Sequence, residues 1–131
     1  MRLVNLTPHD VNLALDGTVV TVPRSGVVLR LEEHDEPIFN NPIPIVRRRF
    51  QVPDPVWVAE QAAQAEGVTL PDVSLPLTIV IVSLPVLMSL PTDTLAYLTG
   101  KGIILAAPDT GKGAVRDEKG QIVAVRGLVT K

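Results

Sequence analysis

The sequence contains no cysteine and very few aromatic residues. The lack of cysteine excludes disulfide scaffolds, thiolate zinc sites and cysteine nucleophiles. Aromatic residues make up only 3% of the chain while hydrophobic residues make up 46%, so the core must be built from valine, leucine, isoleucine and alanine. Base stacking on aromatic side chains, a common mode of binding to single-stranded nucleic acid, therefore has little support.

The chain also lacks a large net charge and a long apolar segment. Its 131 residues carry a formal net charge of −2, which argues against general electrostatic binding to nucleic acid or anionic membranes. No apolar run approaches the ~20 residues that cross a bilayer, and no signal-peptide pattern is present. We therefore expect a cytoplasmic protein without a membrane partner.

Proline, in contrast, is abundant, with 12 residues, and arginine outnumbers lysine. Each proline fixes φ and removes a backbone donor, so the chain should contain many forced turns. Together with the lack of cysteine, this composition favours a hot or GC-rich source. The length predicts one domain that spans residues 1–131.

The first third of the chain predicts an antiparallel β meander. Apolar runs at Leu3–Leu6 and Val11–Leu15 flank a polar turn, and Asp16-Gly17 is a strong signal for a hairpin into the valine-rich segment that follows. Val27–Leu31 is predicted as a further strand. The acidic and proline-rich segment Glu32–Pro44 is predicted as a loop.

Ile45–Val52 predicts a strand that carries three consecutive arginines. Alternation places Arg47 and Arg49 on one face of this strand. Two guanidiniums on one face are enough to clamp a phosphate or a carboxylate. A polar strand face, or an ion-pair patch between subunits, is the simpler interpretation.

The clearest helix start in the sequence follows this strand. Asp54 can cap a helix, and Pro55 fits its first turn. The stretch that follows is rich in alanine, glutamine and glutamate, and it predicts a helix over residues 55–66 that is stopped by Gly67. An irregular link is expected over Val68–Pro76.

Two unbroken apolar runs, Ile79–Val82 and Ile103–Ala107, indicate strands that are buried on both faces. The connection between them is long enough for a helical crossover, so residues 78–107 predict a βαβ unit. If the two strands are parallel, Ser83 and the Asp109–Gly113 loop emerge at one edge of the sheet. That edge is where open α/β sheets bind ligands.

The remaining segments complete the predicted fold class. Pro91 should divide the crossover into two short helices. Ala114–Asp117 and Gln121–Val129 predict a terminal β-hairpin around Gly120. Many strands with a few short helices indicate an α+β domain with mixed α/β character. Exposed strand edges and a valine-rich surface favour burial by self-association, so we expect a homo-oligomer.

The glycine-rich loop and Ser83 are the first candidates for ligand binding. Glycines let the backbone N–H groups around Asp109 and Thr110 turn toward an anion, and Lys112 favours one. A Walker phosphate loop is excluded, because its first glycine and its magnesium-binding hydroxyl are both missing. A plain glycine-rich turn is the simpler interpretation of the loop, and a helix cap fully explains Ser83.

His9 is the first choice for an acid–base role, because the chain has only two histidines. The run Thr7-Pro8-His9-Asp10 places its imidazole beside a carboxylate, and Asp109 would complete an acid–base pair if the protein is an enzyme. The simpler interpretation is a tight turn whose polar side chains satisfy backbone donors. The sequence contains no complete catalytic set, and we expect no metal or cofactor.

Motifs at both ends of the chain and one in the middle resemble a group of small, uncharacterised bacterial and phage proteins. The resemblance touches roughly a third of the chain. It implies a phage or mobile-element accessory protein in the host cytoplasm, and it implies no activity and no catalytic residue. The residues that carry it are Asn5-Leu6-Thr7-Pro8-His9 with Val11, Ile81-Val82-Ser83, and Arg116-Asp117-Glu118-x-Gly120 with Ile122, Val125, Arg126 and Leu128.

These observations lead to three hypotheses about function. The first is a non-enzymatic, oligomeric accessory protein that binds a small anionic, nucleotide-like molecule or a host protein. The second is a small hydrolase or transferase that acts on a nucleotide or nucleoside. The third is a structural role as a virion or assembly component. The ligand-binding residues expected under the first hypothesis are Ser83, Asp109, Thr110, Lys112, Arg47 and Arg49.

Overall fold

The computed structural model describes residues 1–71 and 73–131. Within these residues there are three helices and eleven strands, an α+β architecture as predicted. In chain order the elements are β1 (Arg2–Asn5), β2 (Val11–Leu15), β3 (Thr18–Val22), β4 (Glu32–Phe39), β5 (Ile45–Gln51), α1 (Pro55–Gln64), β6 (Val68–Thr69), β7 (Thr78–Ile81), α2 (Leu84–Ser89), α3 (Thr92–Gly100), β8 (Ile103–Pro108), β9 (Ala114–Arg116), β10 (Ile122–Val125) and β11 (Leu128–Val129).

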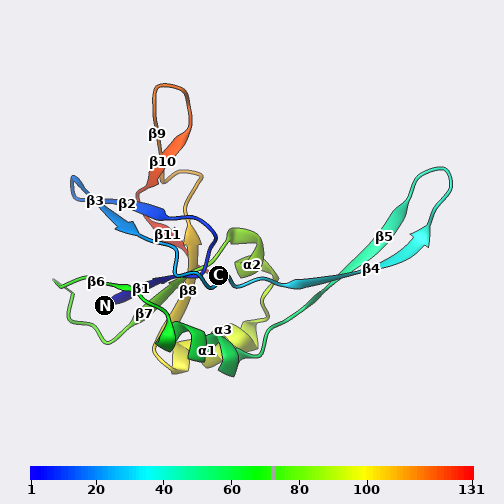
Figure 1. Ribbon diagram of the computed structural model, residues 1–131, viewed down its shortest axis with the longest axis horizontal. Helices are drawn as coiled ribbons and strands as arrows, with labels where there is room; N and C mark the ends of the chain where they lie inside the picture. The colour runs from blue at the N-terminus through cyan, green and yellow to red at the C-terminus, as the bar shows by residue number, and fades with distance from the viewer. Residues whose placement is uncertain (72) are drawn as a thin grey trace.

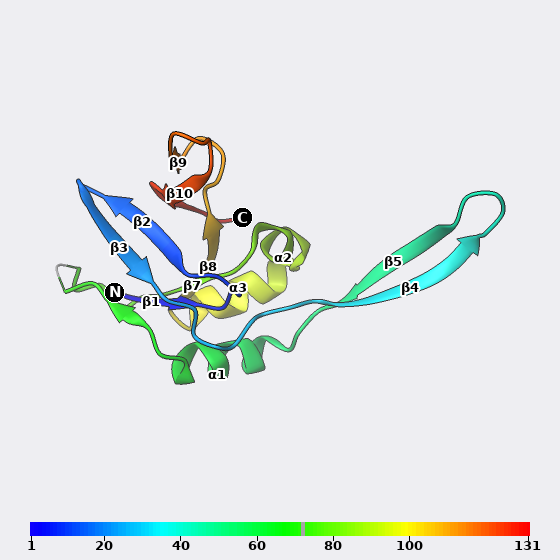
Figure 2. The same ribbon diagram turned by 45° about the horizontal axis from the view of Figure 1, so that its top comes forward.

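The strands form two sheets and a separate hairpin (Figure 1). The larger sheet has the strand order β11-β8-β7-β1-β6, and the smaller sheet has the order β3-β2-β10-β9. The hairpin of β4 and β5 projects from the body as a long arm (Figures 1 and 2). We call this hairpin, with the turn that joins its strands, the arm.

Strands β1, β7 and β8 form the parallel centre of the larger sheet. Ile79 of β7 lies opposite Ile104 of β8 and opposite Leu3 of β1, with all three strands running in the same direction. The predicted βαβ unit over residues 78–107 is therefore confirmed. Consequently the carboxyl ends of the three strands meet at one edge of the sheet.

Alternate residues of these strands face two different cores. Val4 and Val80 pack with Val58 of α1 in the core beneath the helices. Leu3 and Ile81 instead pack with Leu13 in the core that faces the smaller sheet. The molecule thus has three layers, with the larger sheet between the helices and the smaller sheet. Burial on both faces is the reason for the unbroken apolar runs in the sequence.

Helix α1 begins as predicted and ends slightly earlier. The Asp54 carboxylate accepts the Val56 N–H at 2.9 Å, and Pro55 occupies the first turn. The helix ends at Gln64, where the Arg2 guanidinium donates hydrogen bonds to carbonyl oxygens of the last turn. A cation at this position is favourable, because it complements the negative end of the helix dipole.

The predicted N-terminal meander is only partly correct. The hairpin of β2 and β3 is confirmed, and Asp16 and Gly17 adopt φ of 47° and 79° in its turn. However, β1 belongs to the larger sheet, where its two apolar faces are both covered. Val27–Leu31 is not a strand. Its Leu29 is buried and donates its N–H to the Leu6 carbonyl oxygen at 3.0 Å, without a continuing ladder.

The prediction of a loop over Glu32–Pro44 is wrong, since most of this segment forms β4. Charged residues there face arginines on β5, with Asp35 opposite Arg48 and Glu36 opposite Arg47. Cross-strand pairs of opposite charge stabilise a strand that has no apolar face to bury. The acidic composition, which favours a loop when taken alone, gains its strand structure from the partner strand.

The C-terminal prediction is correct for the hairpin and wrong for its second strand. β9 and β10 pair antiparallel, and Gly120 in the turn has φ of 80°. The predicted strand Gln121–Val129 divides near Gly127, after which β11 joins β8 in the other sheet. The crossover divides at Pro91 into α2 and α3, as predicted. Asp72, in the predicted link, lies outside the described residues.

Gly67 should tolerate no side chain, because it approaches β1 closely. A β-carbon at Gly67 would stand 2.6 Å from the Leu3 carbonyl oxygen. Gly67→Ala should therefore lower the free energy of unfolding by about 1–3 kcal/mol, measured by urea denaturation. Gly100→Ala is the matched control. A β-carbon there meets nothing within 4 Å, and alanine in the helix should be neutral or stabilising by up to ~1 kcal/mol. Equal stabilities of the two variants would contradict this contact.

Candidate functional site

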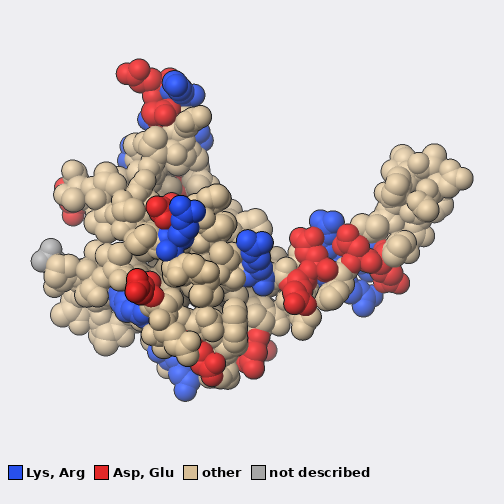
Figure 3. Space-filling view, viewed as in Figure 1, with Lys and Arg blue, Asp and Glu red and all other residues tan. Residues whose placement is uncertain are grey.

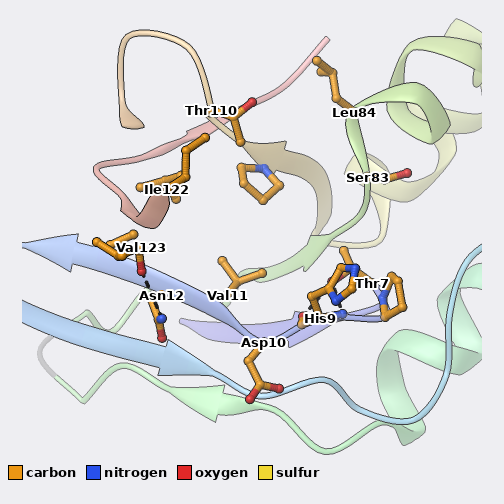
Figure 4. Close-up of a pocket in the computed structure, with 14 residues that line it drawn as sticks. Thr7, His9, Asp10, Val11, Asn12, Ser83, Leu84, Thr110, Ile122 and Val123 are labelled. Carbon is orange, nitrogen blue, oxygen red and sulfur yellow. Dashed lines mark hydrogen bonds between the residues drawn. The ribbon is translucent and has the colours of Figure 1, made fainter. Parts of the chain in front are cut away.

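A cleft of about 640 Å³ opens where the ends of the parallel strands meet the smaller sheet (Figure 4). One wall is the turn after β1 with the start of β2, residues 7–12. The opposite wall is β10, residues 122–125, and the far end holds Ser83 and Leu84 after β7 with Pro108 and Thr110 from the end of β8. The edge predicted to gather ligand-binding groups is thus the edge at which the cleft lies.

The floor of the cleft lies between β2 and β10. These strands pair in parallel at Leu13 and Val125 and then separate toward Asn12. There the Asn12 side-chain amide donates to the Val123 carbonyl oxygen at 3.1 Å, bridging the two strands (Figure 4). The side chains of Val11 and Val123 consequently line an apolar hollow between these two strands of the smaller sheet.

Asn5 fixes the turn that forms one wall. Its side chain is fully buried and donates to the carbonyl oxygens of His9 at 2.7 Å and Val22 at 3.0 Å. Its side-chain oxygen accepts the Thr7 N–H at 2.9 Å and lies 2.6 Å from the Thr7 hydroxyl. The interpretation of this segment as a turn held by its own polar side chains is confirmed. The network presents His9 to the cleft on a fixed backbone.

His9 lines the cleft, whereas the carboxylate of Asp10 points away from it (Figure 4). Asp10 accepts the backbone N–H of Arg24 at 3.0 Å and forms an ion pair with its side chain at 3.5 Å. This carboxylate is therefore directed to Arg24 and not to the imidazole. His9 contributes a group that can donate or accept a hydrogen bond at the cleft wall.

Ser83 and Thr110 bring hydroxyl groups from the ends of β7 and β8. Ser83 occupies the predicted N-cap position of α2, but its side chain makes no capping hydrogen bond within the described residues. Its hydroxyl points away from the centre of the cleft, toward the helices, and Thr110 lies on the side of the rim that follows the end of β8 (Figure 4). The structure thus brings Ser83 and Thr110 to one cleft, as the parallel strands predicted.

Asp109 and Lys112 do not line this cleft. The Asp109 carboxylate accepts the Gly111 N–H at 3.2 Å, and a β-carbon at Gly113 would come within 2.8 Å of it. Asp109 therefore shapes its own loop, which favours the plain-turn interpretation. No hydrogen bond or ion pair joins it to His9 in the described part of the chain, so the expected acid–base pair is not assembled.

Arg47 and Arg49 lie on the arm, outside the cleft. Arg49 forms an ion pair with Glu36 at 3.7 Å. Their neighbour Arg48 donates two hydrogen bonds to Asp35, at 2.9 and 3.1 Å, and these bonds lower the pKa of the Asp35 carboxyl. Because Arg48 and Arg49 pair with carboxylates of their own chain, the arrangement favours a polar strand face over an anion clamp, and the ion-pair patch between subunits stays a prediction.

Most of the lining residues that sequence reasoning missed are apolar. Ile122 and Val123 are consecutive in the sequence and both exposed, 41% and 46%, although one of two adjacent strand residues normally faces the core. The sequence predicts them only as residues of a terminal hairpin. Two adjacent exposed aliphatic residues mark a strand with a hollow beside it. A polar neighbour such as Asn12 gives no comparable signal in the sequence.

Asn5→Ala should destabilise the protein by about 3 kcal/mol, because several buried hydrogen bonds are lost together and their partners stay buried. Asn12→Ala is the matched control, since the Asn12 hydrogen bonds are exposed, and it should cost less than ~1 kcal/mol. Chemical denaturation measures both. A cost for Asn5→Ala no larger than that of the control would contradict the structural role of the turn.

Asp35 should titrate at lower pH in the wild type than in Arg48→Gln, because Arg48 hydrogen-bonds to its charged form. With its folded-state pKa depressed, the pair stabilises the arm above the ordinary aspartate pKa of about 3.9, and this contribution is lost as the pH falls through the folded-state value. Carboxyl NMR titration measures the shift. Arg47→Gln is the control, since no ion pair of Arg47 is found in the described residues. An Asp35 titration that is unchanged in Arg48→Gln would refute the assignment.

Comparisons with known proteins add no family to this picture. No family model, no curated protein and no solved structure matches the chain. Within residues 1–71 and 73–131, no helix is long and apolar enough to cross a membrane, and no group of three or more histidine, aspartate or glutamate residues is placed to hold a metal ion. The chemistry of the cleft itself therefore carries the functional proposal.

Proposed function

We propose that the protein is a non-enzymatic binding protein that holds a small nucleoside-like or nucleotide-like molecule in the cleft at the strand ends. The observation that carries this proposal is the composition of the lining, with an apolar floor between β2 and β10 and a few polar groups on the rim. A mostly apolar concavity with a small number of polar groups is typical of small-molecule sites.

The lining matches the parts of a nucleoside. The side chains of Val11 and Val123 can contact the face of a base, and the groups on the rim can hydrogen-bond to a sugar or to the base edge. The lining contains no lysine or arginine among its described residues, so a triphosphate would have no cationic partner. These features favour a nucleoside, or a ligand with one phosphate held by hydroxyl groups, over a nucleoside triphosphate.

Binding is better supported than catalysis. A general base needs a nearby group that orients it, and a nucleophile needs a base within hydrogen-bond reach. The carboxylates expected beside His9 are engaged elsewhere, Asp10 with Arg24 and Asp109 in its own loop. The hydrolase or transferase hypothesis therefore has no assembled set of residues to support it.

The biological setting of this function rests on the sequence. The accessory role in a phage or mobile element, and the host cytoplasm as its location, follow from the resemblance of the terminal motifs. A small protein that sequesters or senses a nucleoside is compatible with that setting. A host protein as an alternative partner draws no support from the cleft, whose volume of about 640 Å³ is in the range of small-molecule sites.

Thermal unfolding with a panel of nucleosides, nucleoside monophosphates and triphosphates tests the proposal. A member present at about a hundredfold excess over its dissociation constant should add about 2.7 kcal/mol to the free energy of unfolding. Nucleosides or monophosphates should give the shift. If no member of the panel changes the melting temperature, the proposal is wrong.

Val123→Trp should abolish that shift by filling the cleft from its exposed wall. Val19→Trp is the matched control, because Val19 is also an exposed valine, on β3 of the same sheet, and does not line the cleft. Thr110→Val should weaken binding about fivefold to tenfold, which is the loss of one hydrogen bond of ~1 kcal/mol. Binding that survives Val123→Trp would place the ligand elsewhere.

A further inference from the structure

The arm has no core of its own. All residues of β4 and β5 are exposed, and the hairpin projects away from the three-layered body (Figures 1 and 2). A two-stranded hairpin alone in water is marginally stable at best. Both of its outer edges also present unpaired backbone N–H and C=O groups, which proteins normally cover or protect. A partner that lies along the arm would cover these edges and stabilise the hairpin.

The two strands of the arm carry opposite charges. β4 holds the acidic residues Glu32, Glu33, Asp35 and Glu36, and β5 holds Arg47, Arg48 and Arg49. In the space-filling view these charges gather along the part of the arm nearer the body, while its tip is uncharged (Figure 3). One edge of the arm is therefore acidic and the other edge is basic.

The tip of the arm is apolar and exposed to water. Ile38, Phe39 and Ile43 are 54%, 53% and 65% exposed, and Ile45 beside them is half exposed. Such a cluster of large apolar side chains is uncommon on the surface of a monomer and marks an interaction site. The tip and the charged edges lie on the same hairpin, so one partner can cover both.

We infer that the partner is a second copy of this chain, and that the arms of neighbouring copies pair edge to edge, with β4 of one arm against β5 of the next. This pairing places each row of carboxylates between two rows of arginines. A two-fold pairing would place β4 against β4, or β5 against β5, with like charges directly opposite, which is destabilising. Charge complementarity thus selects the head-to-tail arrangement.

The head-to-tail arrangement also satisfies the backbone. When neighbouring arms point the same way, β4 of one arm and β5 of the next run antiparallel, as the two strands do within one arm. The result is a continuous antiparallel sheet with the apolar tips side by side. Because each copy offers one acidic and one basic edge, the contact repeats and builds a closed ring or an open filament of more than two copies.

After the ion pairs within one arm are formed, guanidinium N–H groups of β5 are still available for this contact. Arg48 is held by Asp35 and Glu33, at 2.9 and 3.4 Å. Arg49 meets Glu36 at 3.7 Å, and no ion pair of Arg47 is found in residues 1–71 and 73–131. A guanidinium has five N–H donors, so Arg47 and Arg49 can serve carboxylates of a neighbouring β4.

A charge-swapped arm tests the pairing mode, with size-exclusion chromatography and light scattering as the readout. In this variant β4 is basic and β5 is acidic, so the ion pairs within one arm can still form with their charges exchanged. The net charge is unchanged. The wild type and the variant should each form assemblies larger than a dimer. When they are coexpressed with different tags, each should exclude the other, because acidic edges would then meet acidic edges. The substitutions are Glu33→Arg, Asp35→Arg, Glu36→Arg, Arg47→Glu, Arg48→Asp and Arg49→Glu.

Other outcomes overturn the proposal. Preferential mixing of the two proteins would indicate two-fold pairing of equivalent edges, and free mixing would show that the charged edges do not select partners. A wild type that stays monomeric at micromolar concentration would remove self-association itself. A charge-swapped protein that stays monomeric while its melting temperature is that of the wild type would refute charge complementarity. Ligand binding by the cleft is a separate measurement, so its failure would leave these results unaffected.

The contribution of the tip is tested by Phe39→Ser combined with Ile43→Ser. This double variant should raise the concentration needed for half-maximal assembly at least tenfold, because the apolar side chains no longer gain by burial. Val19→Ser on β3 is the control, since it removes an exposed aliphatic side chain (59% exposed) from the body and should leave assembly unchanged. Equal assembly of the double variant and the control would show that the tip takes no part and would overturn its place in the interface.

Discussion

The parallel alignment of β1, β7 and β8 is the constraint on which the rest of the structure depends. These strands are buried on both faces, so each must find a neighbour on either side and a core above and below. With the strands parallel, their carboxyl ends are forced to one edge. Polar residues and turns are excluded from the apolar cores, and they therefore gather at that edge. The cleft lies between this edge and the smaller sheet.

The turn after β1 supplies hydrogen-bond partners to a polar side chain that is buried at the end of an apolar strand. Asn5 is the last residue of β1 and is completely buried, so each of its polar atoms needs a partner. The turn supplies partners at Thr7 and His9, and the end of β3 supplies the Val22 carbonyl oxygen. One side chain thereby connects the larger sheet, the turn and β3 of the smaller sheet. This hydrogen bonding fixes the turn that forms one wall of the cleft.

Local signals in the sequence predict caps, turns and buried strands, whereas the sheet to which a strand belongs depends on partners far away in the chain. The Asp54 cap, the Asp16-Gly17 turn and the apolar runs of β7 and β8 each contain their own physical cause within a few residues. The position of β1 depends on β7, whose residues pair with it from 76 positions later in the chain, and the sequence of β1 fits a meander equally well. Parallel topology fixes where β7 and β8 end and therefore predicts the places of Ser83 and Thr110, whereas the apolar walls of the cleft depend on where β2 and β10 of the smaller sheet separate.

Ser83 lies between the cleft and the root of the arm. This residue lines the cleft, and it also lines a second hollow of about 550 Å³ between α2 and the root of the arm, together with Glu33 and Phe50. A ligand in the cleft and a neighbour along the arm would thus act on the two sides of one short segment. If either event changes the position of that segment, thermodynamic linkage requires the effect to be reciprocal, so that assembly and ligand affinity change each other by the same factor. The two functions inferred for this chain are separate in their chemistry and share one structural support.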